Sequence, residues 1–274
     1  MANVTDSDRV FAGSVPQLYE RYMVPLIFQP YANDMARAAV ACRPRDVLEI
    51  AAGTGVVTRR LAAELPPDAV IVATDLNQAM LDEASARMTA ARPITWRQAD
   101  AMKLPFDDAS FDVVVCQFGA MFFPDRAKAF AEARRVLRPG GTFLFNVWDT
   151  VETNEFVSAI SKALDETFPD NPPRFMHRGP HGYHDHERIR ADVVDGGFPS
   201  AQLETVTHRS RAARAADAAI GYCHGTPWRG EIEAHGAGSL ERATEASTRA
   251  MERAFGSGAV DGRIQAIVVR AARD

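Results

Sequence analysis

The sequence is poor in cysteine and has no long hydrophobic run, and both features exclude classes of protein. The three cysteines, Cys42, Cys116 and Cys223, are odd in number and far apart, so we expect neither a disulfide framework nor a zinc site of the CxxC kind. We therefore expect a protein of the reducing cytoplasm. No stretch approaches the roughly 20 apolar residues that a membrane-spanning helix needs. The N-terminal segment MANVTDSDRVFAGS carries acids where a signal peptide carries basic residues.

Basic residues are not in excess either. The 274 residues include 36 acidic and 31 basic ones, which gives a net charge of −5 with neutral histidine. A nucleic-acid-binding surface needs clustered Lys and Arg, so we expect no nucleic-acid partner. The content of 46% hydrophobic and 24% charged residues is ordinary for a soluble globular protein. A chain of this length can bury a core without metals or disulfides.

Strand-like apolar runs alternate with helical patterns between residues 45 and 150. The run FDVVVCQ is continuous and apolar, as a strand buried on both faces is. Strand, helix and strand in regular succession predict an α/β fold with a parallel sheet and right-handed crossovers. We expect strands at 45–50, 70–74, 94–98, 111–117 and 142–148, and helices at 56–65, 77–90 and 125–137, with a break at residues 139–141 (PGG).

The rest of the chain is less regular. Residues 168–184 are rich in proline, glycine and histidine and predict a loop or lid, whereas 154–167, 186–195 and most of 212–255 have helical patterns. The last two strands are expected at 202–209 and 263–270. Without a repeat or a clear linker, we expect one domain over 1–274. It would comprise an N-terminal helical cover at 1–44, a cofactor-binding core at 45–150, and the remaining strands with a substrate cap at 151–274, including an insertion at about 212–258.

A Gly-rich turn in the segment VLEIAAGTG lies between a strand and a helix, where small residues let the backbone approach a ligand. An NAD-binding turn needs a third small residue for close packing, and the candidates for it here, Val56 and Thr58, fit poorly. Three acids accompany the turn: Glu49 lies within the first strand, Asp75 ends the second and Asp100 follows the third. Carboxylates suit an ammonium group, ribose hydroxyls and an exocyclic amine better than a pyrophosphate. The pattern therefore predicts a ligand that combines a nucleoside with an ammonium group.

Four ordered motifs support a more specific interpretation: VLEIAAGTGVVTRRLA, VATDLNQAML, RQADAMKLPFDDASFDVVVCQFGAMFFPD and EARRVLRPGGTFLFNVWD. Together they resemble the class I S-adenosylmethionine-dependent methyltransferases, in particular the group that includes the ubiquinone/menaquinone biosynthesis C-methyltransferases. The resemblance implies a Rossmann-like sheet of seven strands, mostly parallel, with the last strand antiparallel. It also implies direct transfer of a methyl group from S-adenosyl-L-methionine to a small-molecule acceptor, with S-adenosyl-L-homocysteine as the product. It says little about the acceptor itself.

The same resemblance implies roles for individual residues. Ala51, Gly53 and Gly55 would line the turn beside the methionine part of the cofactor, with Ala51 in place of the usual glycine. Glu49 would help hold the methionine ammonium group, and Asp75 would bind the ribose hydroxyls. The remaining contacts would be Leu76 on the adenine face, Asp100 at the adenine amine, the N–H of Ala101 or Met102 facing the ring, and Gln117 and Phe118 as a floor near the sulfonium.

Two further segments each have two interpretations. The aromatic segment at residues 18–31 either folds over the cofactor, with Tyr22 as the contact to the sulfonium, or packs as a helix against the sheet. His177 and His181 are candidates for a general base on a lid, which is needed only if the acceptor atom carries a proton. The same histidines otherwise belong to a polar surface loop. Their spacing does not suit a structural metal site, and we expect no metal.

Two other functions stay open at the level of sequence. One is an NAD(P)-dependent oxidoreductase, against which Glu49 and the poor third position of the turn argue. The other is a non-catalytic module that binds S-adenosylmethionine, because no catalytic residue stands out. We expect a small-molecule acceptor as the partner, and the sequence is compatible with a homodimer.

Overall fold

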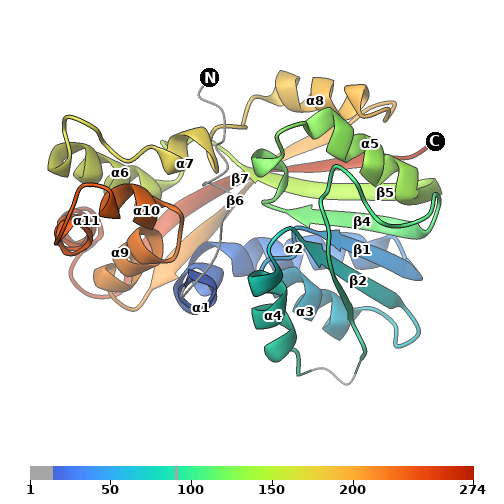
Figure 1. The fold of residues 1–274 in the computed structure, drawn as a ribbon, viewed down its shortest axis with the longest axis horizontal. Coiled ribbons are helices and arrows are strands. Elements are labelled where there is room, and N and C mark those ends of the chain that lie inside the picture. The colour runs from blue at the N-terminus through green and yellow to red at the C-terminus, as the bar shows by residue number, and fades with distance from the viewer. Residues whose placement is uncertain (1–14, 90–91) are drawn as a thin grey trace. The chain divides into compact units, whose positions relative to one another are not determined.

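The computed structural model of the protein describes residues 15–89 and 92–274. The N-terminal segment, in which we expect no signal peptide, and the last residue of the helix expected at 77–90 lie outside the described residues. Within the described part, strands and helices alternate between residues 45 and 150 as expected (Figure 1).

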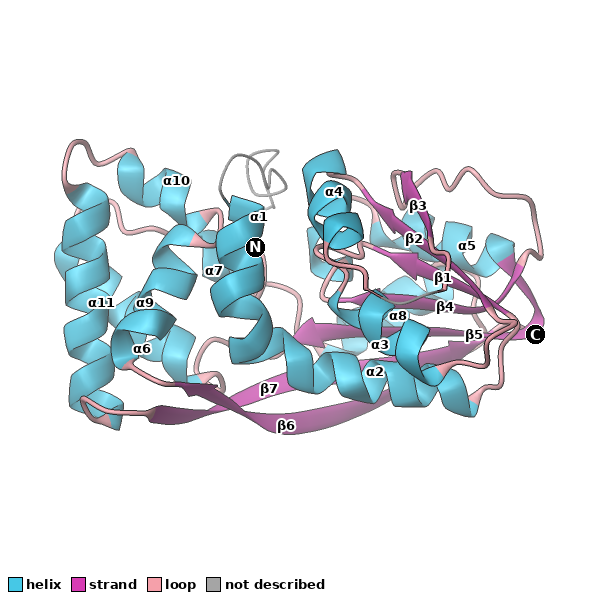
Figure 2. Ribbon diagram, turned by 90° about the horizontal axis from the view of Figure 1, so that it is seen from below, coloured by secondary structure: helices cyan, strands magenta, loops and turns pink. Residues whose placement is uncertain are grey.

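Seven strands of the described chain form one sheet in the order β3-β2-β1-β4-β5-β7-β6. Neighbours among β1 to β5 pair in parallel, whereas β7 pairs antiparallel with β5. In Figure 2, β6 and β7 lie side by side. The strands are β1 Asp46–Ile50, β2 Val70–Asp75, β3 Thr95–Gln98, β4 Phe111–Gln117, β5 Leu137–Trp148, β6 Gln202–Ala212 and β7 Val260–Ala272. The predicted α/β fold, with a mostly parallel seven-stranded sheet and an antiparallel last strand, is confirmed.

The helices of the described residues follow the predicted patterns closely. They are α1 Val15–Leu18, the π-helix η2 Tyr19–Phe28, α2 Gln29–Ala41, α3 Val56–Glu64, α4 Gln78–Ala86, the 3-10 helix η3 Ala120–Phe122, α5 Arg126–Val136, α6 Glu155–Thr167, α7 Phe175–Arg178, α8 His186–Asp195, α9 Ala215–His224, α10 Trp228–Glu233 and α11 Ser239–Phe255. In Figure 1, α5 and α8 lie side by side. The expected loop at 168–184 contains the short helix α7, and the expected insertion before β7 is built from α9, α10 and α11.

The junction between α5 and β5 differs from the prediction. α5 ends at Val136 and β5 already begins at Leu137, so residues 139–141 lie inside the strand and not before it. Gly140 has a φ of +79°, and the register between β4 and β5 shifts just after Phe111. Glycine adopts this conformation without strain, which lets the strand absorb extra residues in a bulge.

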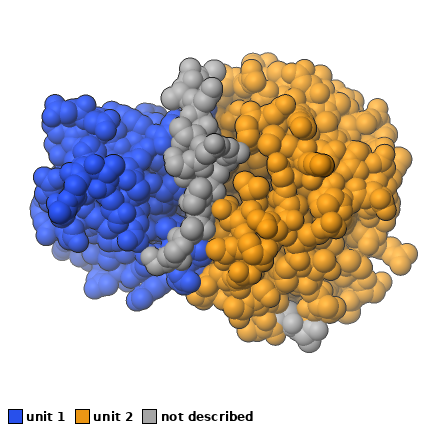
Figure 3. All heavy atoms as spheres, viewed as in Figure 1, with its two compact units in different colours: residues 1–29, 149–182, 207–265 blue, residues 30–148, 183–206, 266–274 orange. Residues whose placement is uncertain are grey.

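The chain folds into two compact units, which are coloured separately in Figure 3. Unit 1 comprises the residues up to 29, 149–182 and 207–265, and unit 2 comprises 30–148, 183–206 and 266–274. The core expected at 45–150 falls almost wholly in unit 2, and the insertion expected at about 212–258 falls in unit 1. Two of the five boundaries between the units lie within β6 and β7. A single domain over the whole chain stays a prediction.

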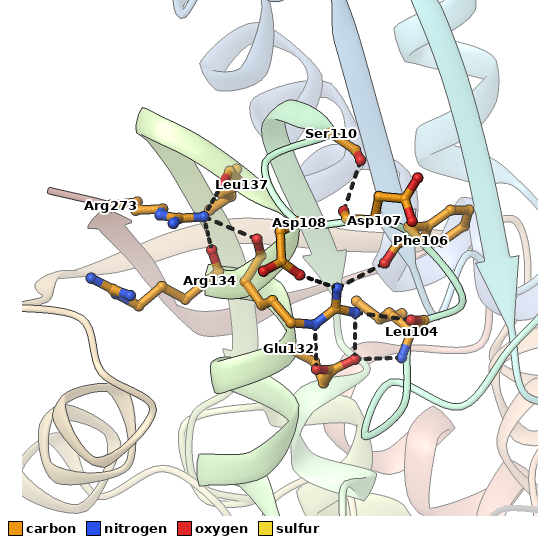
Figure 4. Close-up of polar contacts among 10 residues, drawn as sticks. Leu104, Phe106, Asp107, Asp108, Ser110, Glu132, Arg134, Leu137 and Arg273 are labelled. Atoms are coloured by element: carbon orange, nitrogen blue, oxygen red, sulfur yellow. Dashed lines mark hydrogen bonds and ion pairs between the residues drawn. The ribbon is translucent and has the colours of Figure 1, made fainter.

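Within unit 2, Arg135 of α5 holds the loop between β3 and β4. Its partners Leu104, Phe106, Asp108 and Glu132 are labelled in Figure 4. Its guanidinium donates to the two carboxylate oxygens of Glu132 at 2.7 and 2.8 Å. It also donates to Asp108 Oδ1 at 2.8 Å and to the carbonyl oxygens of Leu104 and Phe106 at 2.9 and 2.7 Å. The bonds from the carboxylates raise the pKa of Arg135, and its guanidinium lowers the pKa of Glu132. The clamp is therefore ionised at neutral pH and fixes the loop to the helix.

We expect Arg135→Ala to lower the free energy of unfolding by about 2 kcal/mol, because the Leu104 and Phe106 carbonyls lose a charged donor. Arg87→Ala is the matched control, since it removes an arginine that pairs with Glu83 across one turn of an exposed helix surface. That change should cost less than about 0.5 kcal/mol. Urea titration followed by circular dichroism measures both values. Equal losses of unfolding free energy in the two variants would contradict the stabilising role of Arg135.

Candidate functional site

The turn between β1 and α3 places three residues in the left-handed region of the backbone. The φ angles are +56° for Ala51, +57° for Gly53 and +81° for Gly55. Glycine tolerates this region, whereas an L side chain costs about 1–2 kcal/mol there. The methyl group of Ala51 lies against Gly119, where an added Cβ would come within 2.5 Å of it. A glycine just after β4 therefore makes room for alanine at the first position of the turn.

The two glycines of the turn serve different purposes. A Cβ on Gly53 would meet only the terminal methyl of Met80, at 3.7 Å, so the space beside Gly53 is open. A Cβ on Gly55 would lie 3.0 Å from the Cβ of Ala84 and 3.3 Å from the ring of Trp96. Gly55 therefore lets α3 begin directly beside α4, while Gly53 leaves room for a ligand.

Asp75 ties this turn to the end of β2. Its Oδ2 accepts a hydrogen bond from the N–H of Gly53 at 2.8 Å, and its Oδ1 accepts one from the N–H of Asn77 at 2.8 Å. Burial raises the pKa of Asp75, and the bonds from Asn77 and Gly53 act in the opposite direction. The side-chain amide of Asn77 adds a longer bond to Oδ1, at 3.5 Å. A carboxylate has about four acceptor positions, so these three bonds do not saturate it.

Glu49 is buried in β1, with 1% of its surface exposed. Its Oε2 accepts a hydrogen bond from the hydroxyl of Thr58 at 2.5 Å. The pKa of Glu49 is raised from 4.5 to about 8, mainly by burial and to a smaller extent by the neighbouring Asp75. The bond from Thr58 and the charge of Arg59 act in the opposite direction. Two of the three predicted acids thus lie close enough to repel each other within unit 2.

Asp100 lies apart from this buried pair and is exposed. Its Oδ1 accepts a hydrogen bond from the N–H of Met102 at 2.9 Å. That N–H, which we expected to face a bound ring, is therefore engaged with the Asp100 carboxylate. Ala101 between them is buried. Leu76, the next residue after Asp75, has 45% of its surface exposed.

Phe118 follows β4 directly and anchors a buried aromatic cluster. Its φ is +53°, and its N–H donates to Asn146 Oδ1 at 2.9 Å. Its ring stacks on Trp148 with 3.7 Å between the centroids and meets the edge of Tyr31 at 5.3 Å. Gln117 beside it is also buried. The end of β4 is therefore a fixed, apolar floor in unit 2.

Sequence reasoning missed three residues that support this arrangement. Thr58 holds Glu49, Asn146 holds the backbone of Phe118, and Gly119 accommodates the methyl of Ala51. A signal existed for each. Thr58 is a polar residue in the first turn of an otherwise apolar helix start, Asn146 interrupts the apolar run TFLFNVW, and Gly119 follows a buried strand immediately.

Comparison with known sequences identifies the family. Residues 48–145 match the family described as a methyltransferase domain. A ubiquinone/menaquinone biosynthesis C-methyltransferase of Ectopseudomonas mendocina is 29% identical over 214 residues, which cover 72% of this chain and 77% of that protein. A demethylmenaquinone methyltransferase of Deinococcus radiodurans is 38% identical over 135 residues, which cover 48% of this chain and 56% of that protein. These matches support the assignment of the chain to the class I S-adenosylmethionine-dependent methyltransferases. This assignment decides against the NAD(P)-dependent oxidoreductase.

Solved structures show that the methyltransferase fold extends over most of the chain. The YcgJ protein of Bacillus subtilis superposes with a TM-score of 0.57 at 19% identity, covering 89% of this chain and 98% of that one. A putative methyltransferase of Bacillus halodurans has a TM-score of 0.55 at 21% identity, covering 88% and 98%. The Rossmann-like methyltransferase fold implied by the sequence motifs is therefore confirmed.

Three predicted site residues of the methyltransferase lie in unit 1. Tyr22 lies in η2. His177 Nε2 is 2.7 Å from the hydroxyl of Ser161, and His181 Nδ1 is 2.6 Å from the carbonyl oxygen of Asp149. Since a carbonyl only accepts, Nδ1 of His181 carries the proton. Burial lowers the pKa of His177 and favours its neutral form. The functional roles of these three residues stay predictions.

The described residues, 15–89 and 92–274, contain no group of three or more His, Cys, Asp or Glu side chains that could hold a metal ion. No helix in the same ranges has the length and apolar character that crossing a membrane requires.

We expect the ligand-free methyltransferase to lose stability as pH rises from about 5 to 7.5, because of Glu49. The folded-state pKa of about 8 lies above the ordinary 4.5, so between these values the folded state holds a proton that the unfolded state has lost. The stabilisation is complete below the ordinary pKa and is lost as pH rises through the folded value. One such proton contributes a slope of about 1.4 kcal/mol per pH unit.

Glu49→Gln should remove this contribution and make the protein more stable than the wild type near pH 8. Glu64→Gln is the control, because Glu64 is a surface partner of Arg60 on α3. Urea titrations at a series of pH values measure the slopes. The interpretation fails if Glu49→Gln and the wild type lose stability in parallel over this range.

Proposed function

We propose that this methyltransferase transfers the methyl group of S-adenosyl-L-methionine to a ring carbon of a small quinone-like molecule. The observation that carries the cofactor part is the buried Asp75 carboxylate, oriented by the N–H groups of Gly53 and Asn77. The acceptor part rests on the relatives, which are named as a ubiquinone/menaquinone biosynthesis C-methyltransferase and a demethylmenaquinone methyltransferase.

Asp75 is suited to the ribose of this cofactor. Two backbone N–H groups fix the carboxylate plane, and the remaining acceptor positions can receive the ribose hydroxyls. The open space at Gly53 allows a ligand to approach the backbone of the turn. The exposed Leu76 next to Asp75 offers an apolar surface to the adenine ring, and the second oxygen of Asp100 can accept from its amine.

Glu49 is suited to the ammonium group of the methionine part. A buried carboxylate with a single hydroxyl donor is costly to ionise, and a cation brought beside it offsets that cost. Binding of the cofactor would therefore favour the ionised form of Glu49 and lower its pKa. Ala51 and Gly55 would complete the turn, and Gln117 and Phe118 would form the floor.

The chain's part in the reaction is mainly positioning. When bound, S-adenosyl-L-methionine supplies a methyl group on a sulfonium, which is already a good leaving group. The protein must align the acceptor carbon and exclude water. A ring carbon that gains a methyl group gives up a proton, so a base is required. His181 is suited to this role, because the Asp149 carbonyl holds the proton at Nδ1 and thereby directs the lone pair of the neutral ring to Nε2. His177 is the second candidate.

The expectations on location and assembly are part of the proposal. Cys42, Cys116 and Cys223 are all free thiols, which supports an enzyme of the reducing cytoplasm. The homodimer stays a prediction.

We expect Asp75→Asn to weaken the binding of S-adenosyl-L-homocysteine by at least about tenfold, because a charged acceptor is lost where each bond is worth roughly 1.5–3 kcal/mol. Asp82→Asn is the matched control, since Asp82 lies on the neighbouring helix α4 and accepts only from Gln78. Isothermal titration calorimetry measures both affinities. An affinity for Asp75→Asn within twofold of the wild type would remove the ribose assignment.

We expect the enzyme to methylate reduced demethylmenaquinone. The product should contain one methyl group in place of one hydrogen, with the label of a methyl-labelled cofactor, and mass spectrometry detects both. The oxidised quinone is the control, because its ring carbon is a poor nucleophile. Tight binding of S-adenosyl-L-homocysteine without any labelled product would retain the cofactor assignment and reject this acceptor class.

A further inference from the structure

Unit 1 contains a pocket with no role in the function proposed above. It encloses about 390 Å³ and lies between the π-helix η2 and the segment that joins β6 to α9. Its side chains are of two kinds, guanidinium groups and an apolar surface. The main contributors are Arg21, Tyr22, Pro25 and Leu26 from η2, Arg211 from the end of β6, and Arg214 from the segment before α9.

Positive charge exceeds negative charge around this pocket. Asp217 is the acid of the lining, and Arg214 makes a two-pronged contact with it, at 2.7 and 3.2 Å. Arg211 donates to Asp261 at 2.9 Å, but Asp261 is shared with Arg209 at 2.5 Å. Four arginines in this region are thus balanced by two carboxylates, which leaves the surface able to attract an anion.

Arg21 has a different environment from the other two. Its guanidinium lies over the ring of Tyr22, 5.1 Å from the centroid. Among residues 15–89 and 92–274 it makes no ion pair with an acid. A stacked guanidinium keeps its N–H donors directed outward around the ring edge. Arg21 can therefore donate to an anion while Tyr22 offers an aromatic surface next to it.

The walls of the pocket are fixed to each other inside unit 1. The buried hydroxyl of Ser210, next to Arg211, donates to the carbonyl oxygen of Leu26 at 2.8 Å. In α9, a Cβ on Gly221 would lie 3.2 Å from the Cβ of Tyr22 and 3.1 Å from the sulfur of Met23. α9 and η2 are therefore as close as glycine allows. The pocket is thus already formed before a ligand binds.

The helix that forms one wall is itself unusual. η2 keeps π-helical geometry over ten residues, with Pro25 inside it. π-helical turns are rare and occur frequently at functional sites, because the wider helix changes the direction of its side chains. Here the wide turns present Tyr22 and Pro25 to the pocket with Arg21 at its rim.

We propose that this pocket binds an organic phosphate with a small apolar group. The guanidinium groups of Arg21, Arg211 and Arg214 would receive the phosphate, since the planar fork of arginine matches phosphate oxygens. Tyr22, Pro25 and Leu26 would contact the apolar group. This gives Tyr22 a ligand other than the cofactor contact expected from the sequence.

Calorimetry of the full-length protein with phenyl phosphate tests the proposal. We expect saturable binding with a dissociation constant below about 1 mM, weakened by salt. Inorganic phosphate, which lacks the apolar group, should bind at least about tenfold more weakly. Equal affinity for the two compounds, or no binding of phenyl phosphate at millimolar concentration, would overturn it.

Variants locate the binding. Arg21→Gln and Arg211→Gln should each weaken phenyl phosphate binding by about tenfold or more. Arg249→Gln is the control, because Arg249 also lies in unit 1 but pairs with Glu245 on the exposed surface of α11. All three variants should keep the wild-type affinity for S-adenosyl-L-homocysteine, which reports a folded protein. Equal phenyl phosphate affinity in Arg21→Gln, Arg211→Gln and Arg249→Gln would place the binding elsewhere.

A last comparison distinguishes the two sources of such a phosphate. Sedimentation with vesicles of phosphatidylcholine, with and without phosphatidylglycerol, tests a lipid head group. Binding to the anionic vesicles that Arg21→Gln and Arg211→Gln both reduce would identify a membrane lipid as the source. Binding of phenyl phosphate without vesicle binding would identify a free metabolite.

Discussion

The Asp75 carboxylate joins two turns that are 22 residues apart, and the geometry of the predicted cofactor site follows from this contact. The turn after β1 needs three left-handed residues, and such a backbone leaves N–H groups that point away from the strand. A buried carboxylate at the end of β2 satisfies one of them, at Gly53, and orients itself by doing so. Because the parallel strands end at the same edge, turn and acid are placed together by the sheet itself.

This arrangement keeps acids buried at some expense in stability. Glu49 and Asp75 both lose solvation, and Asp75 disfavours ionisation of Glu49. Burial raises the pKa of the nearby Cys116 thiol to about 12, with both acids adding to the rise. Cys116 is therefore a neutral thiol and not a nucleophile. A core selected for stability alone would not place two carboxylates here. Under the proposed function, an ammonium group beside Glu49 would offset this cost, while Asp75 would accept hydrogen bonds from the ribose hydroxyls.

Much of the fold could be predicted because it depends on local patterns. β1, β2 and β4 are apolar runs bounded by turn residues, and α8 covers the same residues, 186–195, as the predicted helix. The failures concern contacts between distant residues. Gly140 donates to the carbonyl oxygen of Arg273 and Gly141 accepts from the N–H of Arg273, so residues 139–141 stay in the strand although proline and glycine favour a break. The π-helical geometry of η2 is not visible in a sequence whose pattern is simply helical.

The candidate site also contains residues that local patterns predict and residues that only contacts between distant parts of the chain explain. Glu49, Asp75 and the glycines stand at positions that a single motif fixes, so their placement in unit 2 could be expected. The support from Thr58 and Asn146 requires knowing which side chains meet in the interior. The exposure of Asp100 and the engagement of the Met102 N–H were not expected, because a loop held by Arg135 determines them.

Ligand specificity is also only partly predictable from the sequence motifs. The matched family covers residues 48–145, which contain the turn, the acids and the floor of the proposed cofactor site. The arginine-lined pocket is built from residues 21–26 and 211–217, outside that match. The proposed cofactor site and the proposed phosphate site therefore lie in different parts of the sequence. Relatives that share the first need not share the second, so the pocket is a property to be sought in this chain and not inferred from its family.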